Sequence, residues 1–409
     1  MKRFLRNICF LLLALAACGS ALAAWDAHHF LTTPASAENK ETLFSIRHGA
    51  SLERVAADLA AAGVIADARR FRLLALLRNA QGRIQAGEFL VSGGWTPGRV
   101  LDQITSGRPF LHRLLVREGL SWWETANALE QQGFILFEDF NAVIHDPAFL
   151  REHHIPFGNA EGFLFPETYF LRGPRTPPDK KQARDIASMM VRMFWRRTAP
   201  LWNSLPPRQG VVLTAAGRAA SHQAPPLPAN STLPGANATL TPGCPLPEDL
   251  PAKDAWKDDG PQQPSDVDET ALSRLVILAS LVEKETGVPP ERPRVAGVYA
   301  NRLRLGMLLQ CDPTIIYGLG PAFSGPIRRS QIRDPANPYN TYAHAGLPPG
   351  PICSPSLASL LAAALPEKHG FLYFVATGQG DGGHVFSRTI SEHNAAVRRY
   401  RARLPAGGD

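Results

Sequence analysis

The pattern of apolar and polar positions repeats in the first third of the chain. Residues 45–65 align without gaps to residues 115–135, an offset of 70 residues. Apolar positions at the spacing of one buried helix face predict a helix in each copy, preceded by a short strand and a glycine turn. A serine in N-cap position and a later glycine bound each predicted helix. The identical pairs are Arg47/Arg117, Gly49/Gly119, Ser51/Ser121, Ala56/Ala126, Leu59/Leu129, Gly63/Gly133 and Ile65/Ile135.

A second helix is predicted at "ARRFRLLALLRNA", residues 68–80, and residues 84–107 predict a strand, a turn and a helix that ends at Gly107. The order strand, helix, helix, strand over residues 41–110 resembles a LysM-like module, a small glycan-binding fold. Two interpretations stay open for this segment. It binds a polymer that contains GlcNAc, or it is a structural βααβ unit that binds nothing.

The remaining pattern predicts an amphipathic helix at residues 179–205, an apolar helix from about Thr270, a strand at "FLYFVATG" and a C-terminal helix capped by Ser391. Between Pro206 and Pro264 the chain carries 12 prolines and few large apolar residues. Such a segment buries too little surface to offset its ordering entropy, so we predict a disordered insertion. The elements together predict an α+β protein. The predicted segments are an anchor or signal (1–25), a linker (26–40), the LysM-like module (41–110), the first catalytic part (111–205), the Pro-rich insertion (206–265) and the catalytic core (266–405).

The N-terminus indicates export. Lys2, Arg3 and Arg6 precede 18 uncharged residues, Ile8 to Trp25. This pattern is typical of a secretory signal or a single membrane-spanning anchor. "ALA" at 21–23 could be a cleavage site, and "LAAC" at 15–18 resembles a lipoprotein box. All three interpretations put the rest of the chain outside the bacterial cytoplasm.

Charge and cysteine content narrow the function classes. The net charge of +7 and a pI near 9.3 suit an anionic partner. The sequence has no arginine-rich run, zinc-ligand spacing or nucleic-acid motif, which argues against a nucleic-acid partner. The five cysteines fit no disulfide framework. Only Cys311 and Cys353 lie in ordered-looking sequence, and whether they pair is left open.

Two acids stand at the end of the apolar helix, in "LASLVEKETG". At about 100° per residue, Glu283 and Glu285 point about 200° apart, so they cannot face one cleft as a close pair. A carboxyl group against apolar walls favours its protonated form, as a general acid requires. The alternative is that both acids are ordinary exposed helix residues, and the residues alone do not choose between the two acids.

Other polar clusters are candidates for binding. "EGFLFPETYF" sets Glu161 and Glu167 among aromatic rings. Aromatic rings beside polar groups can form a sugar-binding surface, or they can pack at a corner of the hydrophobic core. "GGHVFSRTISEHN" contains His384 and His393. No G-x-S-x-G elbow or H-E-x-x-H pair accompanies them, so we expect loop or cap roles and neither a metal nor another cofactor.

Several motifs in order carry a resemblance to a known family. They are "EGFLFPETY", "LASLVEKET", "VAGVYANRLRLGMLLQCDPTIIYGLG", "YNTYAHAGLPPGPI", "LYFVATG" and "HVFSRTISEHN". Together they resemble the YceG-like endolytic murein transglycosylases (MltG type). The Pro-rich insertion is longer than this family's pattern, and "ICSPSLASL" departs from the more usual Asn-Pro-Gly.

The resemblance implies a bacterial enzyme with a single-pass anchor in the inner membrane and a catalytic part in the periplasm. It implies cleavage of nascent peptidoglycan strands between MurNAc and GlcNAc, with 1,6-anhydroMurNAc ends that terminate elongation. Peptidoglycan synthases are possible partners under this expectation. The resemblance assigns Glu283 as acid and then base. The other matching motif positions, expected to bind substrate together with Glu161 and Glu167, are Glu285, Asn301, Gln310, Asp312, Thr314, Tyr339, Asn340 and Tyr342.

Two other functions remain alternatives. The chain could be a non-catalytic peptidoglycan-binding scaffold that uses the LysM-like module to recruit the synthesis machinery. It could also be a true muramidase, which adds water to the cleaved bond. The two enzymes differ in their products, because an anhydro end is lighter than a reducing end by one water.

Overall fold

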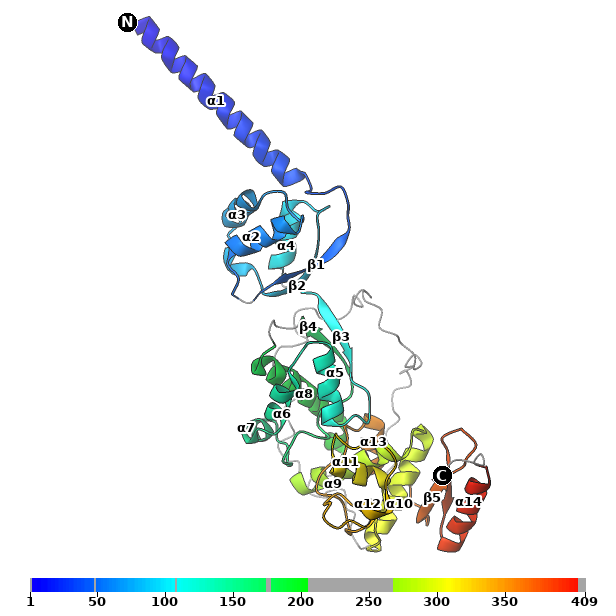
Figure 1. Cartoon of the computed structure of the whole chain (residues 1–409). Helices are drawn as coiled ribbons and strands as arrows, with labels where there is room; N and C mark the ends of the chain where they lie inside the picture. Colours follow the sequence, from blue (N-terminus) through cyan, green and yellow to red (C-terminus); the bar gives the residue numbers. More distant parts are fainter. Residues whose placement is uncertain (1, 48, 107–108, 174–177, 205–267, 404–409) are drawn as a thin grey trace. The chain divides into compact units, whose positions relative to one another are not determined.

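The computed structural model describes residues 2–47, 49–106, 109–173, 178–204 and 268–403. These residues form two compact units. One unit runs to Leu114 and includes the strand β4 (Thr168–Arg172), and the other contains Leu115–Glu167 and the described residues from Pro178 onward (Figure 1). The mixture of helices and small two-stranded sheets is of the α+β class, as predicted. The predicted Pro-rich insertion (206–265) and Gly107 lie outside the described residues.

The first unit has the predicted strand–helix–helix–strand order. Strands β1 and β2 pair antiparallel, with Glu41 opposite Ser92 and Ile46 opposite Gly87. Buried Phe71, Phe89 and Leu101 belong to the core that the helices close. Its elements are α1 (Lys2–Thr32), β1 (Glu41–Ile46), α2 (Leu52–Ala61), α3 (Ala68–Leu77), η1 (Gln81–Arg83), β2 (Gly87–Ser92), α4 (Pro97–Thr105) and β3 (Leu111–Leu115).

The repeated segments fold as the sequence predicts. Ser51 Oγ accepts a hydrogen bond from the Arg54 N–H at 3.2 Å, so it caps α2. Ser121 caps α5 (Trp122–Gln131) in the same way and forms a capping box with Glu124. The glycines of the turns and helix ends have positive φ in both copies, between 68° and 77°. Local chemistry alone therefore sets these two strand–turn–helix segments.

Helix α1 extends beyond the predicted anchor, through Thr32 and into the segment predicted as a linker. Phe30 is buried in the core of the first unit, and Asp26 pairs with Arg70 at 3.1 Å. These contacts hold the end of the helix. Among the helices of the described residues, none is both long and apolar enough to cross a membrane.

The second unit is mainly helical. Helix α9 is buried along most of its length, as its all-apolar pattern predicts, and packs against α13 and α10. Each fully buried Leu or Val contributes about 1.5–3 kcal/mol to this packing. Its elements after α5 are α6 (Phe137–Ile144), α7 (Pro147–Glu152), α8 (Lys180–Ser204), α9 (Glu269–Glu285), η2 (Pro289–Glu291), α10 (Arg292–Arg304), α11 (Asp312–Leu319), α12 (Arg329–Ile332), α13 (Leu357–Ala364), β5 (Tyr373–Ala376), β6 (His384–Ser387) and α14 (Ile390–Arg403).

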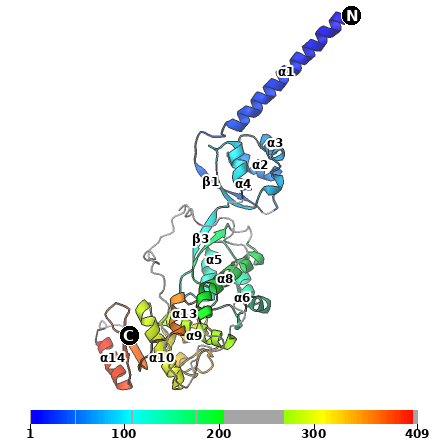
Figure 2. The ribbon, with the colours of Figure 1, turned by 180° about the vertical axis from the view of Figure 1, so that it is seen from behind.

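The end of the chain forms a small layer of its own. Strands β5 and β6 pair antiparallel, with Ala376 opposite His384, and α14 packs on them. In both views α10 lies between α9 and this β5–β6–α14 layer (Figure 1, Figure 2). The predicted cap of the last helix is wrong: Ser391 lies inside α14, and Thr389 Oγ1 accepts the Glu392 N–H at 3.2 Å. Thr389, two residues before Ser391, satisfies an N–H group of the first turn that Ser391, inside the helix, does not cap.

Candidate active site

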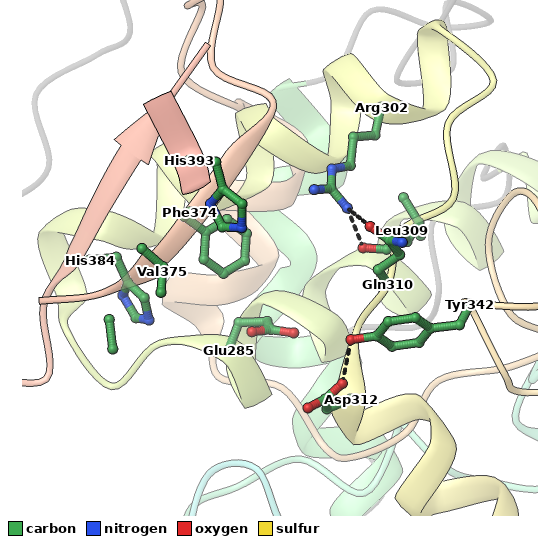
Figure 3. Close-up of a pocket in the computed structure, with 11 residues that line it drawn as sticks. Glu285, Arg302, Leu309, Gln310, Asp312, Tyr342, Phe374, Val375, His384 and His393 are labelled. Carbon is green, nitrogen blue, oxygen red and sulfur yellow. Dashed lines mark hydrogen bonds between the residues drawn. The ribbon is translucent and has the colours of Figure 1, made fainter. Parts of the chain in front are cut away.

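A polar cavity of about 320 Å³ opens in the second unit, where the end of α9 meets α10, the start of α11 and the β5–β6 hairpin. Figure 3 shows the Glu285 carboxyl group in its centre, with His384 and Val375 on one side and Asp312 and Tyr342 on the other. The lining residues come from segments far apart in the sequence. They are Glu285, Arg302, Leu309, Gln310, Asp312, Tyr342, Phe374, Val375, Ala376, His384 and His393.

Glu285 is the last residue of α9 and the half-buried acid of this cavity. The Tyr299 hydroxyl on α10 donates a hydrogen bond to its Oε1 at 2.8 Å. Burial raises the pKa of Glu285 above its ordinary value, and the charge of Asp312 adds to this effect. Hydrogen bonds from Cys311 and Tyr299, and the charge of His384, act against the rise. The net result is an acid that favours its protonated form.

Glu283 has different surroundings, as the helical geometry predicts. Its Oε1 pairs with Arg292 Nη2 at 3.2 Å. Its Oε2 accepts two hydrogen bonds from Ser356, one from the N–H at 2.9 Å and one from Oγ at 2.6 Å. Only 5% of the Glu283 side chain and 10% of the Arg292 side chain are exposed. Glu283 is therefore the centre of a buried ionic network that ties α9 to the N-terminus of α13, and it does not line the cavity.

Three more of the residues predicted to bind substrate line the cavity. The Tyr342 hydroxyl donates to Asp312 Oδ1 at 2.5 Å. Gln310 accepts from Arg302 Nη1 at 3.4 Å, and its backbone φ is 53°, a region that non-glycine residues rarely adopt. Unusual backbone conformations of this kind concentrate at functional sites, where the surrounding structure holds them in place. Here the Gln310 N–H donates to the Thr341 carbonyl at 3.2 Å.

The other predicted residues of these motifs support the cavity walls. Asn301 Nδ2 donates to the carbonyls of His369 and Phe371, at 2.8 and 3.1 Å. Thr314 Oγ1 donates to the Cys311 carbonyl at 2.6 Å within the first turn of α11. Asn340 Nδ2 lies within hydrogen-bond distance of three backbone carbonyls between residues 331 and 334. These side chains satisfy loop backbone groups, so they shape the site without lining it.

Tyr339, Glu161 and Glu167 also lie outside the cavity lining. The Tyr339 ring packs against Tyr317, with ring centroids 4.8 Å apart. Glu161 is fully buried and accepts the Trp122 N–H at 2.9 Å, while its Oε1 has no hydrogen-bond partner within the described residues. Burial raises the pKa of Glu161 to about 8. Glu167 forms an ion pair with Arg197 on α8.

Three lining residues have roles that the sequence did not indicate. Arg302 is buried and donates from Nε to the Leu372 carbonyl at 2.6 Å, so it holds the approach to β5. His384 and His393 both line the cavity, although their motif had predicted loop or cap roles. The motif "GGHVFSRTISEHN" drew attention to the right histidines. The antiparallel pairing of β5 with β6 sets His384 opposite Ala376, and His384 contacts Glu291 of η2. The sequence does not specify these contacts.

Two cysteines, Cys311 and Cys353, lie in the second unit. Cys311 and Cys353 are both buried and free. Burial raises the pKa of each thiol well above its ordinary value, which keeps both as unreactive thiols. Within the described ranges, no group of three or more His, Cys, Asp or Glu side chains is placed to hold a metal ion.

The fold and the cavity thus define an α+β protein whose candidate active site is built around the half-buried Glu285 carboxyl group. The chain belongs to the YceG-like family, whose sequence model matches residues 44–221 and 251–399. A Bacillus subtilis (strain 168) protein named endolytic murein transglycosylase is 25% identical over 386 residues, 90% of this chain and 88% of the relative. The protein of that name from Streptococcus pneumoniae serotype 2 (strain D39) is 33% identical over 132 residues, 32% of this chain and 24% of the relative. A crystal structure of a YceG-like protein from Listeria monocytogenes aligns with a TM-score of 0.49 and 23% identity, over 88% of this chain and 99% of that chain.

Proposed function

We propose that this chain is an endolytic murein transglycosylase, a lyase that cuts peptidoglycan strands between MurNAc and GlcNAc and leaves 1,6-anhydroMurNAc ends. Family membership and the names of the Bacillus and Streptococcus relatives support this enzyme class. The observation that carries the proposal is the half-buried Glu285 carboxyl group, which lines a polar cavity and whose pKa is raised by burial.

One protonated carboxyl group suits this reaction. Cleavage of a β-1,4 glycosidic bond needs a proton on the leaving GlcNAc oxygen and stabilisation of an oxocarbenium-like transition state. A lytic enzyme requires no activated water, because the MurNAc 6-hydroxyl attacks its own anomeric carbon. The attack is intramolecular, so correct positioning supplies much of the rate. As the hydroxyl attacks, it must give its proton to a base in the cavity.

Glu285 fits the acid role better than Glu283 on the contacts of each residue. A general acid must hold its proton near the operating pH and must reach the substrate. Glu285 lines the cavity, and burial favours its protonated form. Glu283 is compensated by Arg292 and Ser356 and lies away from the cavity lining. The assignment of Glu283 by resemblance stays a prediction, and the same experiment tests both residues.

The neighbouring side chains suit a sugar with hydroxyl and acetamido groups. We assign Gln310, Asp312 and Tyr342 to hydrogen bonding with the substrate, since all three line the cavity. Phe374 offers an aromatic surface at the same site. Asn301, Thr314, Asn340 and the other predicted residues then act indirectly, by holding the loops that carry these groups.

Mass spectrometry of the products tests the function. Purified uncrosslinked glycan strands are incubated with the full chain and with the Glu285→Gln and Glu283→Gln variants. Glu367→Gln, which removes a half-exposed partner of Arg294, is a matched control. We expect anhydro ends from the wild type and the control, and none from Glu285→Gln. Reducing ends would indicate a muramidase, and strands that are bound but never shortened would indicate a scaffold.

The cellular setting is part of the proposal. The basic residues before Ile8 and the uncharged stretch that follows them support an inner-membrane anchor with the catalytic part in the periplasm. The strand–helix–helix–strand segment in residues 41–110 supports a LysM-like role in binding glycan strands, and peptidoglycan synthases are the expected partners. Fractionation of cells that carry the chain with a periplasm-dependent C-terminal reporter checks the location. An inactive reporter in the soluble fraction would contradict it.

A further inference from the structure

A histidine and a glutamate form a tightly held pair in the wall of the cavity. His384 is the first residue of β6, and Glu291 is the last residue of η2. His384 Nδ1 lies 2.7 Å from Glu291 Oε2, and the His384 N–H donates to Glu291 Oε1 at 2.8 Å. Only 13% of the histidine side chain and 15% of the glutamate side chain are exposed. The two contacts fix both the position and the orientation of the imidazole ring.

Further contacts join this His384–Glu291 pair to the candidate acid. Thr286 follows Glu285 in the chain, and its Oγ1 donates to Glu291 Oε2 at 3.3 Å. The Phe374 ring packs edge-on against the His384 ring, with centroids 5.5 Å apart. The end of α9, η2 and the β5–β6 hairpin are thereby held together around one corner of the cavity.

One ring nitrogen of His384, Nε2, stays available for proton transfer. Because Nδ1 faces a carboxylate, the proton of the neutral ring belongs on Nδ1 and the lone pair on Nε2. Nε2 has no hydrogen-bond partner within the described residues, and His384 lines the same cavity as Glu285. A carboxylate that orients the imidazole and stabilises its protonated form is the arrangement that makes a histidine an effective general base.

We propose that His384, oriented by Glu291, is the base that accepts the proton of the attacking hydroxyl group. The inference rests on the proposed lytic function and adds a second catalytic residue to it. The C1–O4 bond breaks, and O4 takes both electrons of that bond and the proton of Glu285. The O6–C1 bond forms, and the proton of O6 passes to Nε2 of His384. The imidazolium then returns this proton to the Glu285 carboxylate through water in the cavity, which resets both groups.

The charges around the two residues are consistent with this division of roles. Glu291 from η2, Asp381 from the turn before β6 and Glu285 from α9 are the acidic groups near His384, and Glu291 contacts its ring directly. Tyr299, Cys311, Asp312 and His384 are the groups that act on Glu285. The proposed base therefore lies against a carboxylate that orients its ring, and burial raises the pKa of the proposed acid.

Kinetics over pH tests the proposal with the full chain and uncrosslinked glycan strands. Histidine is the side chain that ordinarily changes charge between pH 5 and 8. We expect His384→Gln to lower kcat about 100-fold or more, with KM within about threefold, and to remove the acidic limb of the pH–rate profile. Glu291→Gln should keep that limb and move it to lower pH, because the imidazolium loses its neighbouring negative charge.

Two further measurements separate catalysis from structure. Free imidazole should restore part of the rate of His384→Ala, which a purely structural role would not allow. His112→Gln removes another Glu–His pair, the one with Glu88 in the first unit, and should retain the wild-type kcat. A His384→Gln enzyme with wild-type kcat, or one with raised KM and an unchanged acidic limb, would overturn the proposal.

The outcomes also distinguish this inference from the proposed function. If the wild type forms anhydro ends, Glu285→Gln forms none and His384→Gln behaves like the wild type, only the role of His384 fails. If the wild type forms no anhydro ends, the proposed function fails and the base assignment fails with it.

Discussion

The two acids at the end of α9 should respond in opposite ways to the same substitution. Glu283→Gln removes the charge that compensates Arg292, while Glu285→Gln replaces a carboxyl group of raised pKa by an amide of nearly the same shape. The first change should destabilise the fold, and the second should abolish activity while leaving the fold intact.

The loss of stability expected for Glu283→Gln follows from the burial of Arg292. Arg292 is 10% exposed, and its Nε has no hydrogen-bond partner within the described residues. Without Glu283 its remaining partner is Glu118, which is 3.6 Å away and largely exposed. Breaking a buried ion pair from one side costs about 3–5 kcal/mol. In a domain of this size that is a fall in Tm of about 6–20 °C. Glu285→Gln keeps an acceptor for the Tyr299 hydroxyl and should stay within about 1 kcal/mol of the wild type.

Differential scanning calorimetry of the wild type and the two glutamine variants measures this contrast, and the anhydro-end assay runs on the same samples. The reasoning is refuted if Glu283→Gln unfolds at the wild-type Tm and forms no product while Glu285→Gln remains active. That result would restore the assignment made by resemblance.

Three other predictions concern groups around the site. Glu161, with a pKa of about 8, keeps in the folded state a proton that the unfolded chain releases near pH 4.5. The contribution of Glu161 to the free energy of unfolding is therefore fully present at low pH, and it falls by about 1.4 kcal/mol per pH unit up to about pH 8. Urea titrations should find that this fall is absent in Glu161→Gln. Gly162→Ala should cost at least about 2 kcal/mol, because φ is +82° and a Cβ would lie 2.7 Å from Pro351 and Val276 side chains. The control Gly133→Ala, at φ +76° with nothing within 4 Å, should cost only about 1–2 kcal/mol, and equal losses in denaturant titrations would contradict this. Tyr299→Phe removes a hydrogen bond that favours the Glu285 carboxylate, so the alkaline limb of the pH–rate profile should move to higher pH; a move to lower pH would argue against Glu285 as the acid.

Local elements were predictable because their signals are local. Ser51 and Ser121 sit three residues before the N–H groups that they cap, and the glycines at the helix ends have the positive φ that their positions require. The apolar pattern of α9 likewise predicted its burial. The error at Ser391 was of one or two residues, because Thr389 competes for the same capping role.

The site was predictable only in part. Helical periodicity showed that Glu283 and Glu285 diverge, but it could not say which of them faces a cavity. The answer depends on Arg292 and Ser356, which bind Glu283, and on the β5–β6 hairpin, which lines the cavity together with Glu285. The hairpin begins at Tyr373, 88 residues after Glu285. No pattern in either segment shows that the two line one cavity. For the same reason the pairing of His384 with Glu291 was invisible in the sequence.

The position of Glu285 as the final residue of α9 has a further consequence. The aligned peptide dipoles of a helix place a partial negative charge at its C-terminus, where a carboxylate is disfavoured. A seventeen-residue helix, buried along most of its length, therefore points the repulsive end of its macrodipole at the acid. The last turn of α9 therefore adds to the burial that raises the pKa of Glu285. Buried residues such as Leu272, which do not line the cavity, contribute by packing the helix that carries this turn.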